Sequence, residues 1–199
     1  MTGQSACTPA SPGYYVDTNA STAQTPCGLG TWNNMTGQSA CTPASPGYYV
    51  ESSWTEFIED AVAISSGSGH TCAILIDGSV SCWGMNNAGQ LGDNTTTDRL
   101  TPTQTESLGE NRTAVAITTG WAHTCAILDD GSVSCWGLNN DGRLGDNTTS
   151  QRHVPTKTAS LGENRTAVAI SSGNAHTCAI LDDGSVSCWG YNLFGQLGD

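Results

Sequence analysis

The amino-acid sequence predicts an all-β fold, and three observations lead to that prediction. A repeat of 53 residues has a core that reads GSGHTCAILIDGSVSCWG from Gly67 and returns almost unchanged from Gly120 and Gly173. Inside each copy, apolar residues alternate with polar ones over short runs, as they do in half-buried strands. No window shows a helical period. Such a repeat is one supersecondary unit copied along the chain, and three units of about four strands each predict a partial β-propeller.

Each predicted strand follows from its residues. The apolar run 61–64 is the first strand of the unit, and in the second copy the alternating runs 123–128 and 132–136 flank the turn 129–131, which reads DDG. A three-residue turn that ends in Gly suits a type I turn followed by a left-handed residue, where Gly has no Cβ penalty. A fourth strand is expected at the edge of each unit, where Pro is tolerated, in the segments TPTQT and VPTKT.

The hairpin turn also sets the cysteine pairing. Its register places Ile127 opposite Val133 and Cys125 opposite Cys135, with all four side chains on the expected core face. Opposite residues of a non-hydrogen-bonded pair are close enough for a disulfide bond. Buried reduced cysteines are the alternative, whereas zinc is disfavoured because C-x9-C lacks the short spacing of structural zinc sites. The predicted disulfides are Cys72–Cys82, Cys125–Cys135 and Cys178–Cys188.

The first 50 residues contain a second, shorter repeat. Residues 1–16 return identically as residues 35–50, a period of 34. This part has too little apolar sequence for a core, so its order would come from disulfide bonds and turns. Cys27–Cys41 is the expected bond, and Cys7 is left over, as a truncated repeat requires.

The two repeats divide the chain into parts. The 34-residue repeat is incomplete at the start of the sequence, and the 53-residue repeat is incomplete at its end. Because Met1 also corresponds to the internal Met35, we expect the sequence to be a piece of a longer protein. A short intact protein that closes by self-association is the alternative, and closing the propeller needs either missing blades or self-association. The expected parts are a cysteine-rich module at 1–50, a linker at 51–60 and propeller repeats at 61–199, divided into 61–113, 114–166 and a truncated 167–199.

Two family resemblances extend this reading. The pattern AVAI-x-x-G-x-x-HTCAIL-x-DGSV-x-CWG-x-N-x-x-G-x-LGD, over residues 61–199, is similar to the regulator of chromosome condensation repeat. That resemblance implies a seven-bladed β-propeller, of which about three blades are present. The motifs C-x-x-GT-x-N, TGQS-x-C and PGYYV of the first 50 residues resemble the cysteine-rich repeats of ephrin-receptor-like and tumour-necrosis-receptor-like proteins.

Composition and charge restrict the partners. Six basic residues stand against 18 acidic ones, for a formal net charge of −12, and such a chain cannot form the wide basic face that nucleic acid requires. No segment predicts membrane insertion. Disulfides on this scale indicate an extracellular or cell-surface protein. Six sequons are compatible with a glycoprotein, at Asn19, Asn34, Asn94, Asn111, Asn147 and Asn164.

No arrangement of residues predicts catalysis. The Asp129-Asp130 pair is interpreted as turn chemistry, because the first copy has Ile76 at the first position. The run NNDGRLGDN resembles a calcium loop only loosely, since it lacks the ligand order of an EF-hand. The sequence therefore predicts a non-enzyme without cofactor or metal. Three histidines, His70, His123 and His176, are interpreted as residues that hydrogen-bond the backbone within or between blades. Three tryptophans, Trp83, Trp136 and Trp189, are interpreted as core or inter-blade packing residues.

The copies differ mainly in loops, where a rigid β scaffold usually places recognition. Neutral drift among surface loops would leave the same pattern. We expect a non-catalytic binding or adhesion module for a protein or glycan. Members of the resembled family suggest two alternatives, an intracellular guanine-nucleotide exchange or chromatin-type regulator and a propeller-type enzyme inhibitor. The candidate ligand-binding residues are Met85, Trp121, Asp141, Arg143, Tyr191 and Phe194.

Overall fold

The computed structural model describes residues 60–159 and 161–198 and, before them, four strands of two residues each. The chain divides into two compact units, Met1–Phe57 and Ile58–Asp199. In the first unit β1 pairs with β2 and β3 with β4, both antiparallel. These strands are β1 Tyr14–Tyr15, β2 Thr25–Pro26, β3 Thr31–Trp32 and β4 Thr42–Pro43. The expected Cys27–Cys41 bond, Cys7, Asn19 and Asn34 lie outside the described residues.

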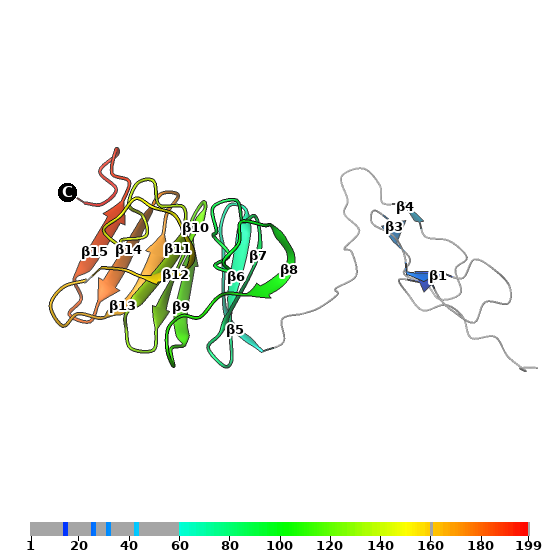
Figure 1. The fold of residues 1–199 in the computed structure, drawn as a ribbon, viewed down its shortest axis with the longest axis horizontal. Helices are drawn as coiled ribbons and strands as arrows, with labels where there is room; N and C mark the ends of the chain where they lie inside the picture. The colour runs from blue at the N-terminus through cyan, green and yellow to red at the C-terminus, as the bar shows by residue number, and fades with distance from the viewer. Residues whose placement is uncertain are drawn as a thin grey trace, which may run out of the picture. The chain divides into compact units, whose positions relative to one another are not determined.

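The second unit consists of three antiparallel sheets in which each strand pairs with the next one in the sequence (Figure 1). Blade 1 contains β5 Ala61–Ser66, β6 His70–Leu75, β7 Val80–Gly84 and β8 Arg99–Gln104. Blade 2 contains β9 Ala114–Thr119, β10 His123–Leu128, β11 Val133–Gly137 and β12 Arg152–Lys157. Blade 3 contains β13 Ala167–Ser172, β14 His176–Leu181 and β15 Val186–Gly190. These sheets confirm the prediction of an all-β partial propeller. Among the described residues, no helix is long and apolar enough to span a membrane.

The central hairpin of each blade has the register that its turn predicts. In blade 2, Cys125 pairs with Cys135, and Gly131 adopts a φ of 75°. Asp130 Oδ1 accepts the backbone N–H of Ser132 at 2.9 Å, which confirms the interpretation of the aspartate as a turn residue. The same register and turn bond recur in blades 1 and 3. The three predicted disulfides are confirmed, each with a Cα–Cα separation of 4.1 Å: Cys72–Cys82, Cys125–Cys135 and Cys178–Cys188.

The blades stack around their first strands. Strand β9 contacts both β5 and β13, so the first strands of successive blades are neighbours and lie nearest the propeller axis. Strands β8 and β12 form the outer edges of their sheets. Both outer strands contain the proline that the sequence placed there, Pro102 in β8 and Pro155 in β12. Pro lacks a backbone donor, and an outer edge does not require one.

The hydrophobic core lies between blades. Blade 2 covers one side of blade 1, and blade 3 covers one side of blade 2, so each of the two interfaces joins two different sets of residues. Trp136 is fully buried between blades 1 and 2, which confirms its interpretation as a packing residue. Blade 2 presents Cys125, Ile127, Val133, Cys135 and Leu144 to blade 3. Blade 3 covers this set with Ala167, Ala179 and Leu181, and with the half-buried Trp189.

Candidate interaction face formed by the loops

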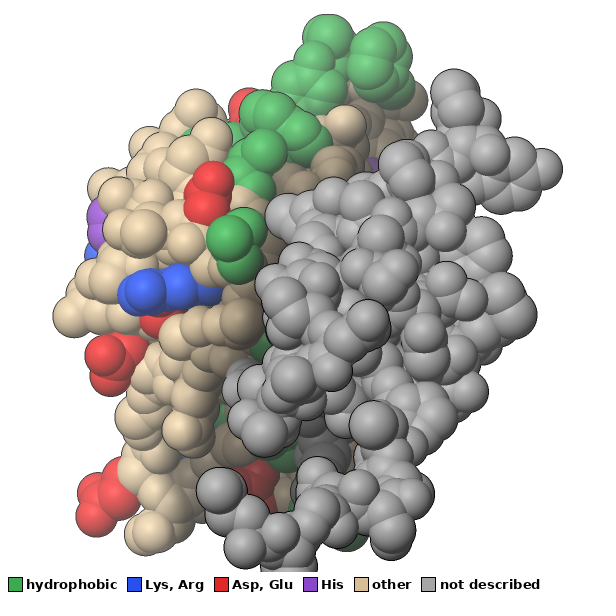
Figure 2. Space-filling view, turned by 90° about the vertical axis from the view of Figure 1, so that its right-hand side faces the viewer, with side chains coloured by type: hydrophobic (Ala, Val, Ile, Leu, Met, Phe, Trp, Pro, Cys, Tyr) green, Lys and Arg blue, Asp and Glu red, His purple; other side chains and the backbone are tan. Residues whose placement is uncertain are grey.

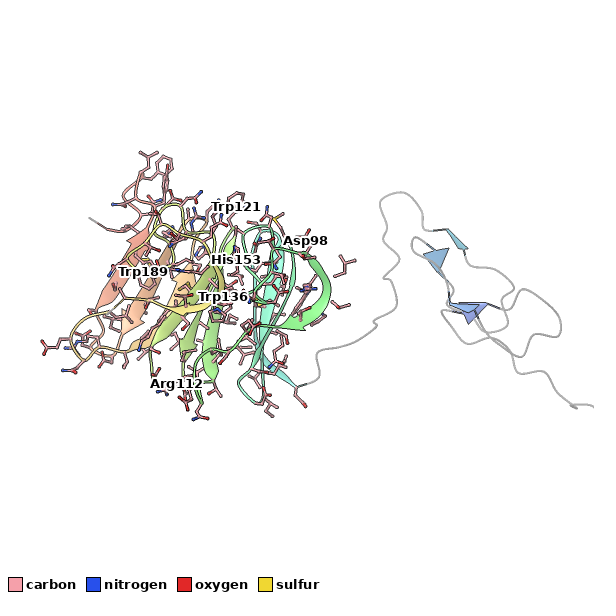
Figure 3. All side chains as sticks on the ribbon, in the orientation of Figure 1. Asp98, Arg112, Trp121, Trp136, His153 and Trp189 are labelled. Carbon is pink, nitrogen blue, oxygen red and sulfur yellow. A yellow bond between two sulfur atoms is a disulfide. The ribbon has the colours of Figure 1, made fainter. Side chains whose placement is uncertain are left out.

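The antiparallel topology gathers the variable loops at one end of the repeat unit. In every blade the first and third strands run toward this end, so the loop that follows each of them lies there. We name this end the loop face, and the opposite end, which carries the Asp-Gly turns and the connections between blades, the hairpin face. In Figure 3, Trp121 marks the loop face and Arg112 the hairpin face. The loop face comprises residues 67–69, 85–98, 120–122, 138–151, 173–175 and 191–198.

Four of the candidate ligand-binding residues are apolar or aromatic, and all four lie on the loop face. Phe194 is 84% exposed, Trp121 50% and Met85 42%. Tyr191 is half-buried and meets Phe194 edge to face, with ring centroids 6.3 Å apart, and Leu193 beside them is also exposed. Figure 2 shows hydrophobic side chains gathered at this end. The structure therefore brings the apolar candidates together on one face.

Backbone hydrogen bonds hold the loops that carry these side chains. The N–H of Met85 donates to the carbonyl of Gly69 at 2.8 Å, which ties two loops of blade 1 together, and the same bond recurs in blades 2 and 3. The N–H of Trp121 donates to the carbonyl of Asn174 at 3.3 Å and ties blade 2 to blade 3. The aromatic candidates are thus presented by loops that the scaffold holds in place.

The two charged candidates are engaged with each other. Asp141 and Arg143 form an ion pair in which the arginine side chain is only 4% exposed. A second guanidinium nitrogen of Arg143 donates to the carbonyl of Asn174 at 3.4 Å, so the residue links blade 2 to blade 3. This burial leaves Arg143 little surface for the direct ligand contact that the sequence suggested, whereas Asp141 remains partly exposed.

A buried asparagine holds the long loop together in blades 1 and 2, a role that sequence reasoning missed. Asn139 is fully buried, and its Nδ2 donates to Asp146 Oδ1 and to the carbonyls of Thr148 and Ser150, each at 3.0 Å. Its Oδ1 accepts the N–H of Leu144 at 3.0 Å. The equivalent asparagine of blade 1 makes the same set of bonds. The available signal was that the asparagine is kept in W-G-x-N while its neighbours vary.

The arginine that follows each of these two loops, at the start of β8 or β12, neutralises an aspartate of the loop. Arg152 Nε donates to Asp146 Oδ2 at 2.7 Å, and Arg99 Nε donates to Asp93 Oδ2 at the same distance. Burial alone would raise the pKa of Asp146, but hydrogen bonds, led by the hydroxyl of Thr148 and by Arg152, hold that pKa below its usual value. The acidic residue at the end of NNDGRLGDN is therefore committed to an internal ion pair, which disfavours the calcium interpretation.

The repeated histidines join adjacent blades. His70 Nε2 lies 2.9 Å from the hydroxyl of Thr124, and that hydroxyl donates to the carbonyl of Gln90 at 2.8 Å. Because the hydroxyl proton goes to the carbonyl, His70 carries its own proton on Nε2 and donates it. His123 and Thr177 form the same relay between blades 2 and 3. These two histidines thus bond between blades as predicted, but their partner is a threonine hydroxyl and not the predicted backbone group.

Burial keeps both of these histidines uncharged at neutral pH. It lowers the pKa of His70 from 6.5 to about 4. It also lowers the pKa of His123 from 6.5 to about 3, with a smaller contribution from the positive charge of Arg143. A neutral imidazole with one hydrogen-bond donor can be buried in the packed interface between two sheets, so these histidines have a structural role.

The hairpin face carries most of the acidic residues that the structure describes. Arg112 pairs there with Asp129 at 3.3 Å and with Asp130 at 3.2 Å, both in the turn of blade 2. Arg165 repeats this arrangement with Asp182 and Asp183 in the turn of blade 3. The loop face has four described acidic residues and one arginine, and Arg99 and Arg152 adjoin it as the first residues of β8 and β12. The hairpin face has nine acidic residues and two arginines, and Lys157 adjoins it as the last residue of β12. The two faces therefore offer different chemistry to a partner. The acidic residues of the hairpin face are Asp60, Asp77, Glu106, Glu110, Asp129, Asp130, Glu163, Asp182 and Asp183.

The four described sequon asparagines share one local geometry. All have exposed side chains and left-handed backbone angles, a conformation that Asn tolerates better than most residues. Their modification remains a prediction. They are Asn94 with φ 59°, Asn111 with φ 55°, Asn147 with φ 59° and Asn164 with φ 56°.

Comparison with known proteins agrees with this architecture. E3 ubiquitin-protein ligase HERC2 of Homo sapiens is 36% identical over 146 residues, which are 72% of this chain and 3% of that protein. Ultraviolet-B receptor UVR8 of Arabidopsis thaliana is 32% identical over 135 residues, which are 68% of this chain and 30% of that protein. The chain thus spans less than a third of the length of these two relatives.

Solved structures show the same fold. Prp20p from Saccharomyces cerevisiae superimposes with a TM-score of 0.60 at 25% identity, over 69% of this chain and 34% of that one. Human WBSCR16 superimposes with a TM-score of 0.59 at 20% identity, over 85% of this chain and 41% of that one. A model of the regulator of chromosome condensation (RCC1) repeat matches residues 77–127 and 130–180, and a second model of that repeat matches residues 61–90, 114–143 and 167–196. With about half of its residues matched by the first model alone, this chain belongs to the family of RCC1-repeat proteins.

Proposed function

We propose that this chain is a non-catalytic module that binds a protein or glycan ligand on its loop face, outside the cell. One observation carries the proposal: the positions at which the repeat copies differ gather on one face and expose Trp121 and Phe194 there. Large aromatic side chains are the residues that most often anchor an interface. Loops on a rigid β scaffold supply the variation that recognition requires.

The charged residues at the loop face are mostly paired with one another, which favours a ligand whose contacting groups are apolar or uncharged. Arg143 of this face is paired with Asp141, and Arg99 and Arg152, which adjoin the face at the start of β8 and β12, are paired with Asp93 and Asp146. Of the remaining charged residues described there, Asp98 accepts the backbone N–H of Asn86 at 2.7 Å. Apolar side chains and the faces of sugar rings both pack well against aromatic rings. We expect binding to depend only weakly on salt, because few unpaired charges are available.

The disulfides support a location outside the cell. Three cross-strand bonds lie in the repeats, and such bonds persist in oxidising compartments and are rare in the cytosol. A free-thiol count by mass spectrometry on natively produced, unreduced protein tests this part of the proposal. Six protected cysteines with the three hairpin bonds mapped are expected. Six free thiols in the repeats would contradict the extracellular location.

Binding is tested with the purified chain on arrays of cell-surface proteins and glycans. Trp121→Ala and Phe194→Ala should each weaken a captured ligand by roughly 30-fold, the size of a hot-spot residue. Leu100→Ala is the matched control, because Leu100 is apolar and 96% exposed but lies on the outer strand β8. A ligand that binds both aromatic variants as well as it binds the unmodified chain would contradict the assignment to the loop face.

A second candidate is an intracellular regulator that binds proteins through the hairpin face. Prp20p has been characterised for its binding to Gsp1p and histones, and yeast RCC1 (Prp20) has been crystallised bound to Kap60. The acidic residues of the hairpin face favour this candidate for a basic partner, because opposite charge steers association. Binding by this route should fall steeply with salt. The salt dependence of any captured partner therefore separates the two candidates.

A further inference from the structure

The long loops of blades 1 and 3 are each closed by a glutamine side chain. In blade 1, Gln90 is fully buried, and its Oε1 accepts the backbone N–H of Ala88 at 2.9 Å. In blade 3, Oε1 of Gln196 accepts the backbone N–H of Phe194 at the same distance. A glutamine at this position therefore makes its bond within its own loop.

Blade 2 has Asp141 and Arg143 at these two positions. Arginine has no acceptor atom, so it cannot make the bond of the glutamine, and the carboxylate of Asp141 pairs with its charge instead. The arginine side chain is 4% exposed, and its Nε has no hydrogen-bond partner among the described residues. A buried donor without a partner is costly, so a glutamine would suit this loop better by itself. The arginine is therefore explained by a contact outside its own loop.

That contact is a backbone carbonyl of blade 3, which two groups of blade 2 share. Nη1 of Arg143 donates to the carbonyl of Asn174 at 3.4 Å, and the N–H of Trp121 donates to the same oxygen at 3.3 Å. A carbonyl oxygen has two lone pairs and can accept both bonds. In blade 1, where Gln90 replaces the arginine, no described residue of blade 2 accepts the N–H of Ser68, the counterpart of Trp121. The arginine and the bond between the loops thus occur together, at the loop that exposes a tryptophan.

We propose that Arg143 is a positioning residue for Trp121. Through the shared carbonyl of Asn174 it holds the loop 120–122 against the loop 173–175, and so fixes the indole ring before the ligand arrives. A side chain that is already held in its bound position loses less conformational entropy on binding. Strand β9 of blade 2 contacts a blade on each side, so this network lies within a complete interface. The inference rests on the proposed loop-face function and assigns Arg143 a part in it that needs no contact with the ligand.

Fluorine NMR of the chain labelled with 5-fluorotryptophan tests the positioning without any ligand. The signal of Trp121 is identified as the one that Trp121→Phe removes. Arg143→Gln gives the loop the glutamine of blades 1 and 3, so the N–H of Asp141 gains an acceptor while the bond to Asn174 is lost. The Trp121 signal should shift and become narrower as the ring gains mobility, and the Tm of the variant should change little.

Two controls separate positioning from a general loosening of the loop. Arg152→Gln is the same substitution at the end of the same loop, but Arg152 bonds to Asp146 and Thr148 and not to Asn174. Asn174→Ala keeps the backbone carbonyl that accepts both bonds. The Trp121 signal should stay in place in both controls. An unchanged Trp121 signal in Arg143→Gln, or an equal displacement in Arg152→Gln, would overturn the proposal.

Ligand affinity tests whether the position of the ring matters for recognition. For a ligand captured on the loop face, Arg143→Gln should weaken binding roughly 10-fold, about the effect of losing one hydrogen bond, although Asp141 and the indole ring are retained. Unchanged affinity despite a displaced Trp121 signal would overturn the role of Arg143 in recognition. A chain that captures no ligand would contradict the proposed function, whereas the fluorine signal decides by itself whether Arg143 positions Trp121.

Discussion

Acid should destabilise the repeat unit above the pH at which its carboxylates titrate, because two histidines are buried uncharged. His70 is 3% exposed and His123 is fully buried. Burial lowers their pKa values from 6.5 to about 4 and about 3. In the unfolded chain both imidazoles return to the ordinary value and take up a proton as the pH falls. Protonation therefore favours the unfolded chain.

The magnitude follows from the two pKa values of each group. At a pH between the folded and the unfolded pKa of a histidine, the unfolded state binds more protons than the folded state. The contribution of these two histidines to the free energy of unfolding is therefore fully present above pH 6.5 and is lost as the pH falls toward 4 or 3. From pH 7 to pH 5 each histidine removes about 2 kcal/mol of unfolding free energy, and the two together remove about 4 kcal/mol. The aspartates with lowered pKa values lose their contribution mainly below pH 5.

Urea unfolding followed by tryptophan fluorescence at pH 7, 6 and 5, at constant ionic strength, measures this loss. His70→Gln keeps an N–H donor near Thr124 but cannot titrate, so its loss between pH 7 and pH 5 should be about 2 kcal/mol instead of about 4. Thr124→Val is the control: it removes the acceptor but leaves His70 buried, so it should lower stability at pH 7 and keep the pH slope. Equal slopes in the unmodified chain and in His70→Gln would refute the reasoning.

Three further substitutions test the packing. Gly120→Ala would place a methyl group 2.2 Å from His123 Cε1, so we expect a loss of about 2 kcal/mol or more in thermal unfolding, and an unchanged Tm would show that the loop adapts freely. Asn139→Ala leaves the N–H of Leu144 without its acceptor and should cost about 2–3 kcal/mol, seen as faster proteolysis at residues 138–151; equal cleavage rates would contradict its bridging role. Trp136→Ala should cost about 3–5 kcal/mol in urea unfolding, and a loss below about 1 kcal/mol would mean that the neighbouring blades close the cavity.

Sequence reasoning was most successful where the interacting residues are close in the chain. The Asp-Gly turn specifies the hairpin register, and the register places Cys125 opposite Cys135 without any information from another blade. The outer strands were found because proline is tolerated at a sheet edge. Asn139 was missed, although it is equally local, because its bonds run mainly to backbone groups within one loop. Backbone acceptors leave no pattern of side chains in a sequence.

Contacts between blades could not be assigned from the sequence. Every copy contains a threonine beside its histidine, so His70 could in principle use Thr71 of its own blade or Thr124 of the next. The structure selects Thr124, 54 residues away. The burial of Arg143 has the same origin, because the carbonyl that accepts from it belongs to the loop of blade 3. A sequence of repeated copies does not distinguish between equivalent partners.

The sequence by itself determined the strands, the hairpin turns, the cysteine pairs and the family, because each depends on residues within a single repeat. Only the tertiary structure decided that both sides of the central strands of blade 2 are buried, which histidine meets which threonine and which variable positions share the loop face. Those features arise from stacking one sheet on the next. Stacking depends on complementary surfaces of whole blades, and neighbouring residues in the chain do not specify it.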